Sequence, residues 1–431
     1  MSRDNARPGG TRHGPRRTPQ IRTTIARAPD AGVGIGPALV LAPGRERSLQ
    51  LRHPWVFSGA IERVEGNPEP GDTVTIVGAD GTLLAQAAYS PSSQIRARVW
   101  SFAPDVAIDE KFIARTVERA CAARASMRDA QHTACRVLHG EADGLPGAIA
   151  DRYGKVVVLQ CLSAGAERWR RVIADALAYA NDAQCVFERS DADVRALEGL
   201  PVRTGAIVGA LPETVGIVED GIEYGVDVVH GQKTGFYLDQ RPNRRIVRQH
   251  AAGRRVLNAF CYTGGFSLAA LAGGARDVLS IDSSADSLVL AKANLARNTW
   301  LDPDKAKWLE GDVFAELRRL RDSGASFDLI VLDPPKFAPT AAHAERAARA
   351  YKDINLLALK LLANDGLLAT FSCSGGVSAE LFQKIVAGAA VDAHADAQIL
   401  AHLSSGADHP VGLQFPEGDY LKGLLLRKRG A

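Results

Sequence analysis

The second half of the chain alternates short, continuous apolar runs with longer segments whose apolar residues recur at helical spacing. The runs predict strands at 255–260, 277–281, 327–332 and 366–372, and the periodicity predicts helices at 265–272, 284–298 and 346–362. Strands that alternate with amphipathic helices are typical of a doubly wound, mostly parallel sheet. Further apolar segments at 410–413 and 420–426 predict a terminal antiparallel hairpin. We therefore expect an α/β domain over residues 221–431.

The preceding part of the chain has a pattern of short strands and turns. Residues 38–41, 73–77 and 83–87 are predicted strands, and the last two flank a Gly78-Ala79-Asp80-Gly81 turn. In the next predicted strand, 95–100, apolar residues alternate with Arg96 and Arg98, which predicts one basic face. These features indicate a small all-β domain over residues 37–105.

Residues 106–220 mix the two kinds of element. Helices are predicted at 109–128 and 167–180, and strands at 135–139, 155–162 and 184–188. This mixture indicates a central α+β domain between the all-β and α/β domains.

Composition and charge narrow the class of protein. The 431 residues include 46% hydrophobic residues and have a net charge of +3, as in ordinary globular proteins. No apolar run approaches the roughly 20 residues of a membrane-spanning helix. None of the six cysteines shows C-x-x-C spacing, so we expect no metal site. Six cysteines in a chain of this size do not form a disulfide scaffold, so we expect a cytoplasmic protein. Residues 1–36 hold seven arginines and two aspartates, which predicts a disordered basic tail, either a solvated extension or an RNA-binding arm.

The first strand of the α/β domain leads into a turn that predicts a nucleoside site. Tyr262, Thr263 and Gly264 follow this strand, where a ligand binds in open α/β sheets. Asp282 ends the next strand and can accept both ribose hydroxyls of an adenosine. The dinucleotide fingerprint G-x-G-x-x-G is absent, so S-adenosylmethionine (SAM) fits better than NAD. Asp312 follows a further short strand, where it either receives the adenine amine or caps a helix.

Two segments at later strand ends carry reactive groups. Asp333-Pro334-Pro335 fixes an extended loop, from which Asp333 can bond a planar, amine-bearing base. Cys373 lies between Ser372 and Ser374, and we expect nearby amides and a cation to lower the pKa of its thiol. A thiolate that adds to carbon 6 of a pyrimidine makes carbon 5 a nucleophile. The base that removes the carbon-5 proton is not identified. The alternative is methylation of a guanine or an exocyclic amine without a covalent intermediate.

Taken together, several blocks resemble the bacterial 23S rRNA (cytosine-C5)-methyltransferases that have an N-terminal PUA domain. The resemblance covers about residues 37–430. Its blocks are residues 44–45, 53–61, 141–147, 151–154, 231–241, 262–266, 333–337 and 372–374. The stretch 231–241 and the two catalytic blocks, 333–337 and 372–374, are highly specific. It implies a Rossmann-like class I methyltransferase domain with a mostly parallel seven-stranded sheet, SAM as the cofactor, and a cytosine of 23S rRNA or its large-subunit precursor as the target. A homodimer is a further expectation.

The resemblance also assigns roles to residues of this chain. Cys373 is the expected nucleophile and Asp333 orients the base. The expected cofactor contacts are Gln232, Asn258, Tyr262, Thr263, Gly264, Asp282, Asp312 and Asp333. Asn258 stands where SAM enzymes commonly have an acidic residue, and Lys336 stands where other RNA cytosine-C5 enzymes often have a second cysteine. For RNA binding the candidates are Arg45, Trp55, Arg96, Arg98 and Lys336.

Overall fold

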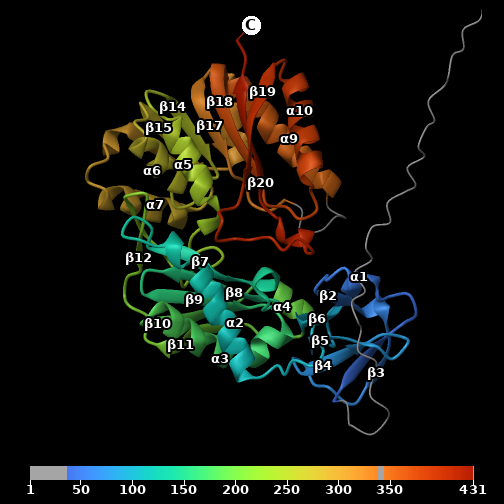
Figure 1. Cartoon of the computed structure of the whole chain (residues 1–431). Coiled ribbons are helices and arrows are strands. Elements are labelled where there is room, and N and C mark those ends of the chain that lie inside the picture. Colours follow the sequence, from blue (N-terminus) through green and yellow to red (C-terminus); the bar gives the residue numbers. More distant parts are fainter. Residues whose placement is uncertain (1–35, 338–343, 431) are drawn as a thin grey trace, which may run out of the picture.

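The computed structural model describes residues 36–337 and 344–430. The prediction for the basic tail lies outside these residues. Three large sheets follow one another along the chain, each with its own group of elements, and a two-stranded sheet lies between the second and the third in the sequence (Figure 1). Among the described residues, no helix is both long and apolar enough to cross a membrane.

The first sheet has six strands and forms the small all-β unit. Its strand order is β2-β6-β5-β4-β1-β3. The pair of β1 and β4 is parallel, and all other strand pairs of this sheet are antiparallel. The bounds are β1 (Ala38–Leu41), β2 (Trp55–Phe57), β3 (Ile61–Glu65), β4 (Thr73–Val77), β5 (Leu83–Tyr89) and β6 (Ile95–Ser101), with a short helix α1 (Arg47–Gln50). Alternate residues such as Leu39, Val74 and Ile76 face inward and form its core.

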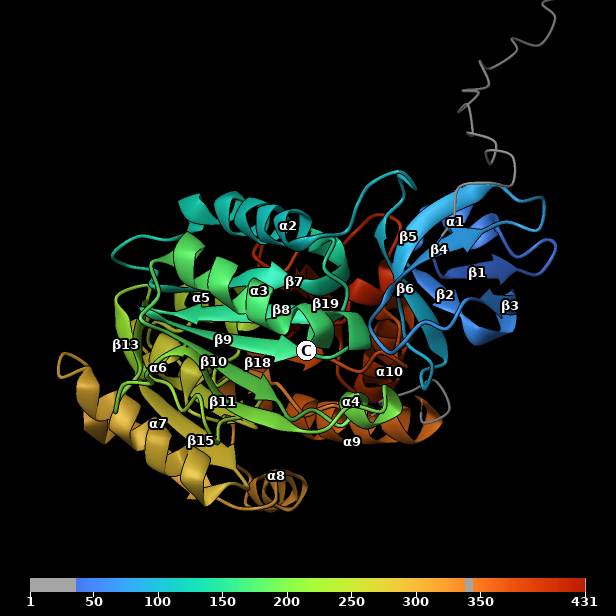
Figure 2. The same ribbon diagram turned by 90° about the horizontal axis from the view of Figure 1, so that it is seen from below.

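The second sheet has five strands, of which β9 and β10 are parallel and the other pairs antiparallel. Helices α2 (Glu110–Ala123) and α3 (Ala164–Asn181) cover one of its faces (Figure 2). The strands are β7 (Ala134–His139), β8 (Ala148–Tyr153), β9 (Val156–Cys161), β10 (Cys185–Ser190) and β11 (Arg203–Gly209), and α4 (Val194–Leu197) lies between the last two. The sequence pattern missed β8, which carries the charged pair Asp151 and Arg152, and the edge strand β11, which contains glycines.

The first two sheets share a core. Trp100 and Ala88 of the first sheet pack into the apolar cluster of the second. Gly165 of α3 makes this contact possible, because a Cβ there would lie 2.4 Å from Ala88 Cβ and 2.6 Å from the Trp100 ring. The all-β unit is therefore held against the central unit by buried apolar contact.

A hairpin and a helix lead into the third sheet. These are β12 (Gly216–Glu219), β13 (Ile222–Gly225) and α5 (Arg241–Gln249). The buried Arg244 of α5 donates to both carboxylate oxygens of Glu219, at 2.6 and 2.7 Å. This bidentate pair fixes the hairpin against the helix.

The third sheet has seven strands in the order β16-β15-β14-β17-β18-β20-β19. All of its strand pairs are parallel except the two that β20 makes. The elements are β14 (Arg255–Ala259), α6 (Gly265–Ala272), β15 (Asp277–Asp282), α7 (Ala285–Arg297), β16 (Ala306–Glu310), α8 (Val313–Asp322), β17 (Phe327–Leu332), α9 (Ala344–Leu361), β18 (Leu362–Ser372), α10 (Ala379–Asp392), β19 (Ala397–Ser404) and β20 (Lys422–Lys428). The expected α/β fold is confirmed.

Successive residues of the central strands face opposite layers of this sheet. Val256 and Leu329 join one apolar cluster with Phe266 of α6, whereas Leu257 and Ile330 join another with α8, α9 and α10. Helices therefore cover both faces, and the carboxyl ends of the parallel strands are the edge left for a ligand.

The prediction of a terminal hairpin is correct for β20 and wrong for its partner. β19 pairs with β20, and residues 410–413 lie in the loop between the two strands. β19 is an edge strand with mostly exposed or half-buried side chains, so its sequence lacks the apolar run of a buried strand.

Candidate active site

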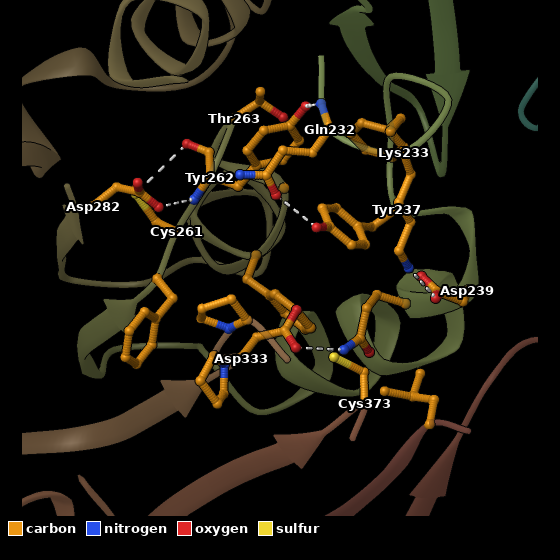
Figure 3. A pocket seen from close by; sticks show the side chains of 18 of the residues that line it. Gln232, Lys233, Tyr237, Asp239, Cys261, Tyr262, Thr263, Asp282, Asp333 and Cys373 are labelled. Carbon is orange, nitrogen blue, oxygen red and sulfur yellow. Dashed lines mark hydrogen bonds and ion pairs between the residues drawn. The ribbon is translucent and has the colours of Figure 1, made fainter. Parts of the chain in front are cut away.

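A cavity of about 380 Å³ opens at the carboxyl edge of the third sheet (Figure 3). Its walls come from the segment before α5, from the β14–α6 turn, from the ends of β15, β17 and β18, and from the loop before β20. The polar residues that line it are Gln232, Lys233, Tyr237, Asp239, Gln240, Arg244, Tyr262, Thr263, Asp282, Ser283, Asp333, Lys336, Cys373 and Tyr420. Parallel strands that end at one edge bring these distant segments together.

One end of the cavity is formed by the turn after β14. The carboxylate of Asp282 accepts the backbone N–H of Tyr262 at 2.8 Å and that of Ser284 at 2.9 Å. Phe260 and Tyr262 have φ values of 61° and 47°, in the left-handed region that non-glycine residues rarely adopt. Strained backbone of this kind is concentrated at functional sites. Asp282 thus holds the turn in a conformation that the chain would not adopt alone.

Two neighbours in this turn differ in character. The hydroxyl of Thr263 is buried and has no hydrogen-bond partner among the described residues, which leaves a polar group at the cavity wall for a ligand. The Cys261 thiol is buried beside Asp282, and burial raises its pKa well above the ordinary value. Cys261 is therefore a neutral wall residue of the cavity.

Three residues predicted to contact the cofactor lie outside the cavity lining. Asn258 is buried and donates to Ser267 Oγ at 2.8 Å, within the core. Asp312 is exposed and caps α8 by accepting the N–H of Ala315 at 2.9 Å. Gly264 has φ of 82° at the start of α6, and a Cβ there would lie 3.0 Å from Trp308. These contacts are local to the fold, and the roles of the three residues in cofactor binding stay predictions.

Cys373 and Asp333 lie side by side at the other end of the cavity (Figure 3). Asp333 accepts a hydrogen bond from Gln240 Nε2 at 3.0 Å. Burial, together with the charge of Asp239, raises the pKa of Asp333 to about 7. Near neutral pH this carboxyl group is thus divided between the protonated and ionised forms.

The thiol of Cys373 does not have the lowered pKa that we expected from the sequence. Burial raises its pKa, and the opposing charge of Lys233 is too weak to reverse this. Asp333 raises it further. The segment after Cys373 is held by Lys422, which donates to the carbonyls of Ser374 at 2.9 Å and Val377 at 2.6 Å.

A cluster of Lys233, Asp239 and Tyr420 lines the cavity and was not assigned from the sequence. Lys233 Nζ and the Tyr420 hydroxyl both donate to Asp239 Oδ2, at 3.0 and 2.6 Å. Lys233 also lies 4.2 Å from the centre of the Tyr237 ring. Burial alone would raise the pKa of Asp239, but Lys233 and these partners hold it below the ordinary value. The sequence pointed to residues 231–241 as a specific block, but it did not reveal the roles of Lys233 and Asp239 within that block.

The residues expected to bind RNA are in different environments. Arg45 and Lys336 are exposed, and Arg96 is half-buried. Trp55 is half-buried: its Nε1 donates to Glu141 at 2.8 Å and its ring centroid lies 4.8 Å from that of Phe415. Trp55 therefore joins all three sheet-bearing units.

The prediction that Arg98 lies on an exposed basic face is wrong. Arg98 is 6% exposed and lies 2.9 Å from Glu198 of the central unit. We expect Arg98→Ala to lower the free energy of unfolding by about 3–5 kcal/mol, because Glu198 would be left as a buried, unpaired charge. Thermal unfolding of the full chain tests this. The control Arg96→Ala should change stability by less than about 0.5 kcal/mol. Equal effects of the two variants would contradict the prediction.

Comparisons with known proteins agree with this geometry. Residues 201–391 match the S-adenosylmethionine-dependent methyltransferase family, and residues 39–102 match the PUA-like domain. Ribosomal RNA large subunit methyltransferase I of Shewanella amazonensis is 50% identical over 389 residues, which cover 90% of this chain and 98% of that protein. The protein of the same name from Aeromonas hydrophila is 50% identical over 395 residues, 91% and 99% of the two chains. The chain belongs to the ribosomal RNA large subunit methyltransferase I family.

Solved structures support the same fold for this member of the large subunit methyltransferase I family. A SAM-dependent methyltransferase from Streptococcus mutans superposes with a TM-score of 0.77 at 23% identity, covering 90% of this chain and 99% of that chain. A methyltransferase solved as a complex with SAH gives a TM-score of 0.79 at the same identity and coverage. The expected SAM-dependent methyltransferase fold with a PUA-like domain is confirmed, and SAM is the cofactor.

The residues of this family member fit SAM at the Asp282 end of the cavity. The carboxylate of Asp282 and the unpaired hydroxyl of Thr263 are the polar groups that would hold the adenosine and its substituents. We expect Asp282→Ala to raise the Kd for SAM about 10- to 100-fold, because hydrogen bonds to a charged group contribute about 1.5–3 kcal/mol. Titration calorimetry measures this, with the exposed Asp286→Ala as control. An unchanged Kd would show that the adenosine binds elsewhere.

Proposed function

We propose that this protein transfers a methyl group from SAM to carbon 5 of a cytosine in 23S rRNA through a covalent cysteine adduct. The observation that carries the proposal is the cavity that has Asp282 at one end and the adjacent Cys373 and Asp333 at the other. The named activity of relatives at 50% identity supports ribosomal RNA as the substrate. A cytosine between the two ends would meet both the methyl donor and the thiol.

The cysteine supplies the nucleophile that the base lacks. Cys373 loses its thiol proton to water, and the thiolate Sγ adds to carbon 6 of the cytosine. The electron pair of the C5–C6 double bond then moves so that carbon 5 becomes nucleophilic. When bound, SAM supplies an electrophilic methyl group. Carbon 5 takes this methyl group and then loses its proton to water. The C6–S bond breaks, ring nitrogen 3 returns its proton to Asp333, and the ring and the thiolate are restored.

Asp333 acts on the opposite edge of the same base. A carboxyl group whose pKa is about 7 can donate a proton to ring nitrogen 3 while its other oxygen accepts the exocyclic amine. Protonation at nitrogen 3 offsets the charge that develops when the thiolate adds. The raised pKa of Asp333 therefore suits the task better than an ordinary carboxylate.

The target base must leave its stack to reach Cys373, at a cost of a few kcal/mol. Arg45 and Lys336 are exposed, and Lys336 is at the cavity itself, so both are available to phosphates. The PUA-like domain and the cavity then contact the same RNA. A ribosomal substrate also supports the expectation of a cytoplasmic protein.

Identification of the modified nucleoside tests the proposal. The full chain is incubated with unmodified 23S rRNA and methyl-labelled SAM, and the digested RNA is analysed by mass spectrometry. Labelled 5-methylcytidine is the expected product. Labelled methylguanosine or an N-methylated base would instead establish the non-covalent alternative. RNA that carries 5-fluorocytidine at the target should form an adduct with the protein that survives denaturation, because fluorine blocks the final elimination.

A further inference from the structure

A second cavity of about 260 Å³ adjoins the catalytic cavity. It lies between the central sheet and the loop before β20, and Lys233 and Tyr420 line both cavities. Its other lining residues are Arg136, His139, Gly140, Glu141, Ala142, Ile149, Gln160, Pro410, Phe415 and Gly418. Lys233 and Tyr420 therefore form a wall common to both cavities, and two linked groups of one ligand could occupy its two sides.

The second cavity is not a phosphate site. The guanidinium of Arg136 donates to both carboxylate oxygens of Asp151, at 2.8 and 2.7 Å. Lys233 is paired with Asp239 at 3.0 Å, and Glu141 adds a negative charge. Among the described lining residues each cation therefore has an acidic partner, so a neutral group fits better than an anion.

Neutral hydrogen-bonding groups and an aromatic wall remain. Burial and the charge of Arg136 lower the pKa of His139 to about 2, so its ring is neutral. Arg136 donates to His139 Nδ1 at 3.3 Å, which leaves the proton on Nε2 as a donor. Gln160 donates its amide to the carbonyl of Arg189 at 3.0 Å, and its oxygen accepts no hydrogen bond from a described residue. The cavity thus offers a donor and an acceptor.

The aromatic wall is fixed by its neighbours. Phe415 packs against Trp55 with ring centroids 4.8 Å apart and against His53 at 5.8 Å. Trp55 is in turn held by Glu141. A planar group that enters would meet an aromatic side chain already ordered by three units of the protein, which lowers the entropy lost on binding.

We propose that the second cavity binds the unpaired nucleobase of a nucleotide next to the target cytosine. A nucleobase is neutral and planar and has donors and acceptors on its edge, and an RNA chain supplies one base to each of two adjoining cavities. The volume is below the roughly 300–1000 Å³ of sites for larger ligands, in keeping with a single ring system. This inference rests on the proposed function, since it takes RNA as the ligand.

Removal of single bases tests the assignment. The substrate is a 23S rRNA fragment that the wild-type protein methylates, and each nucleotide flanking the target is replaced in turn by an abasic ribose. We expect one flanking replacement to lower kcat/KM roughly tenfold or more. Ala142→Phe, which fills the second cavity, should lower kcat/KM on intact RNA by a similar factor and be insensitive to that replacement. The exposed Ala107→Phe is the control, and Ile149→Phe is a second filling variant should the first fail to fold.

Two outcomes would overturn the inference. One is that no flanking abasic site lowers wild-type kcat/KM by more than about twofold; the other is that both filling variants methylate intact RNA as well as the control does. Affinity for the same RNAs, measured by fluorescence anisotropy with SAH present, does not depend on which atom is methylated. A protein that binds these RNAs with the expected pattern but forms no 5-methylcytidine would contradict the proposed function alone.

Discussion

Replacement of Cys373 with alanine is expected to lower the rate of methyl transfer to rRNA by at least about 10³-fold, or about 4 kcal/mol in the activation barrier. Without the thiol, carbon 5 of cytosine is too weak a nucleophile to attack a methyl donor. SAM binding should be unchanged, because Cys373 lies at the opposite end of the cavity from Asp282. Initial rates with labelled SAM measure the effect.

Cys261→Ala is the matched control for this variant. Cys261 is a buried thiol that lines the same cavity, and its raised pKa keeps it neutral. We expect its replacement to lower the rate less than tenfold. If Cys373→Ala retained a rate near that of the wild type, the covalent route would be excluded and methylation of a guanine or an exocyclic amine would be favoured.

The raised pKa of Cys373 also has a consequence for the pH dependence of that rate. The nucleophile is the thiolate, whose fraction increases with pH up to a pKa above the ordinary value. Asp333 must instead be protonated, and that form is lost above pH 7. Together they predict that kcat/KM rises up to about pH 7 and then levels off, since one fraction falls as the other grows.

The sequence predicted the parts of the site that follow from parallel strands. Once residues 255–260, 277–281, 327–332 and 366–372 are strands of one parallel sheet, the side chains at their carboxyl ends meet at one edge. Asp282, Asp333 and Cys373 are therefore expected at one edge from the sequence alone. The α/β fold was predictable for the same reason, because buried parallel strands are continuous apolar runs.

The remaining parts of the site depend on contacts that no local pattern encodes. Asp239 receives the Tyr420 hydroxyl from 181 positions further along the chain, and Arg98 pairs with Glu198 of another unit. Asn258 occupies the position of an acidic residue but is directed into the core, where it bonds Ser267. Hydrophobic periodicity predicts which face of a helix or strand is buried. It does not predict which other element packs against that face, and these side-chain contacts depend on that packing.

Asp333→Asn is expected to lower the methyl transfer rate about 10²- to 10⁴-fold, the range usual for loss of a general acid. Asparagine can still accept the hydrogen bond from Gln240 and is close in shape, so the cavity is preserved. It cannot protonate ring nitrogen 3. The same variant should lose the levelling near pH 7, and its remaining activity should keep rising toward the pKa of Cys373.

Asp333→Asn should increase the stability of the protein although it lowers the rate of methyl transfer. The pKa of Asp333 is raised in the folded state from 3.8 to about 7, so the folded form favours the protonated acid. The stabilisation of the folded state by the protonated Asp333 is fully present below pH 3.8 and is lost as the pH rises through 7. By pH 8 the half-buried carboxylate of Asp333 opposes folding by roughly 4 kcal/mol at most. Asp333→Asn removes this cost, so thermal unfolding of the full chain should show the variant to be more stable than the wild type at pH 8. The difference should shrink by more than half at pH 5, and a gain that is independent of pH would contradict the raised pKa.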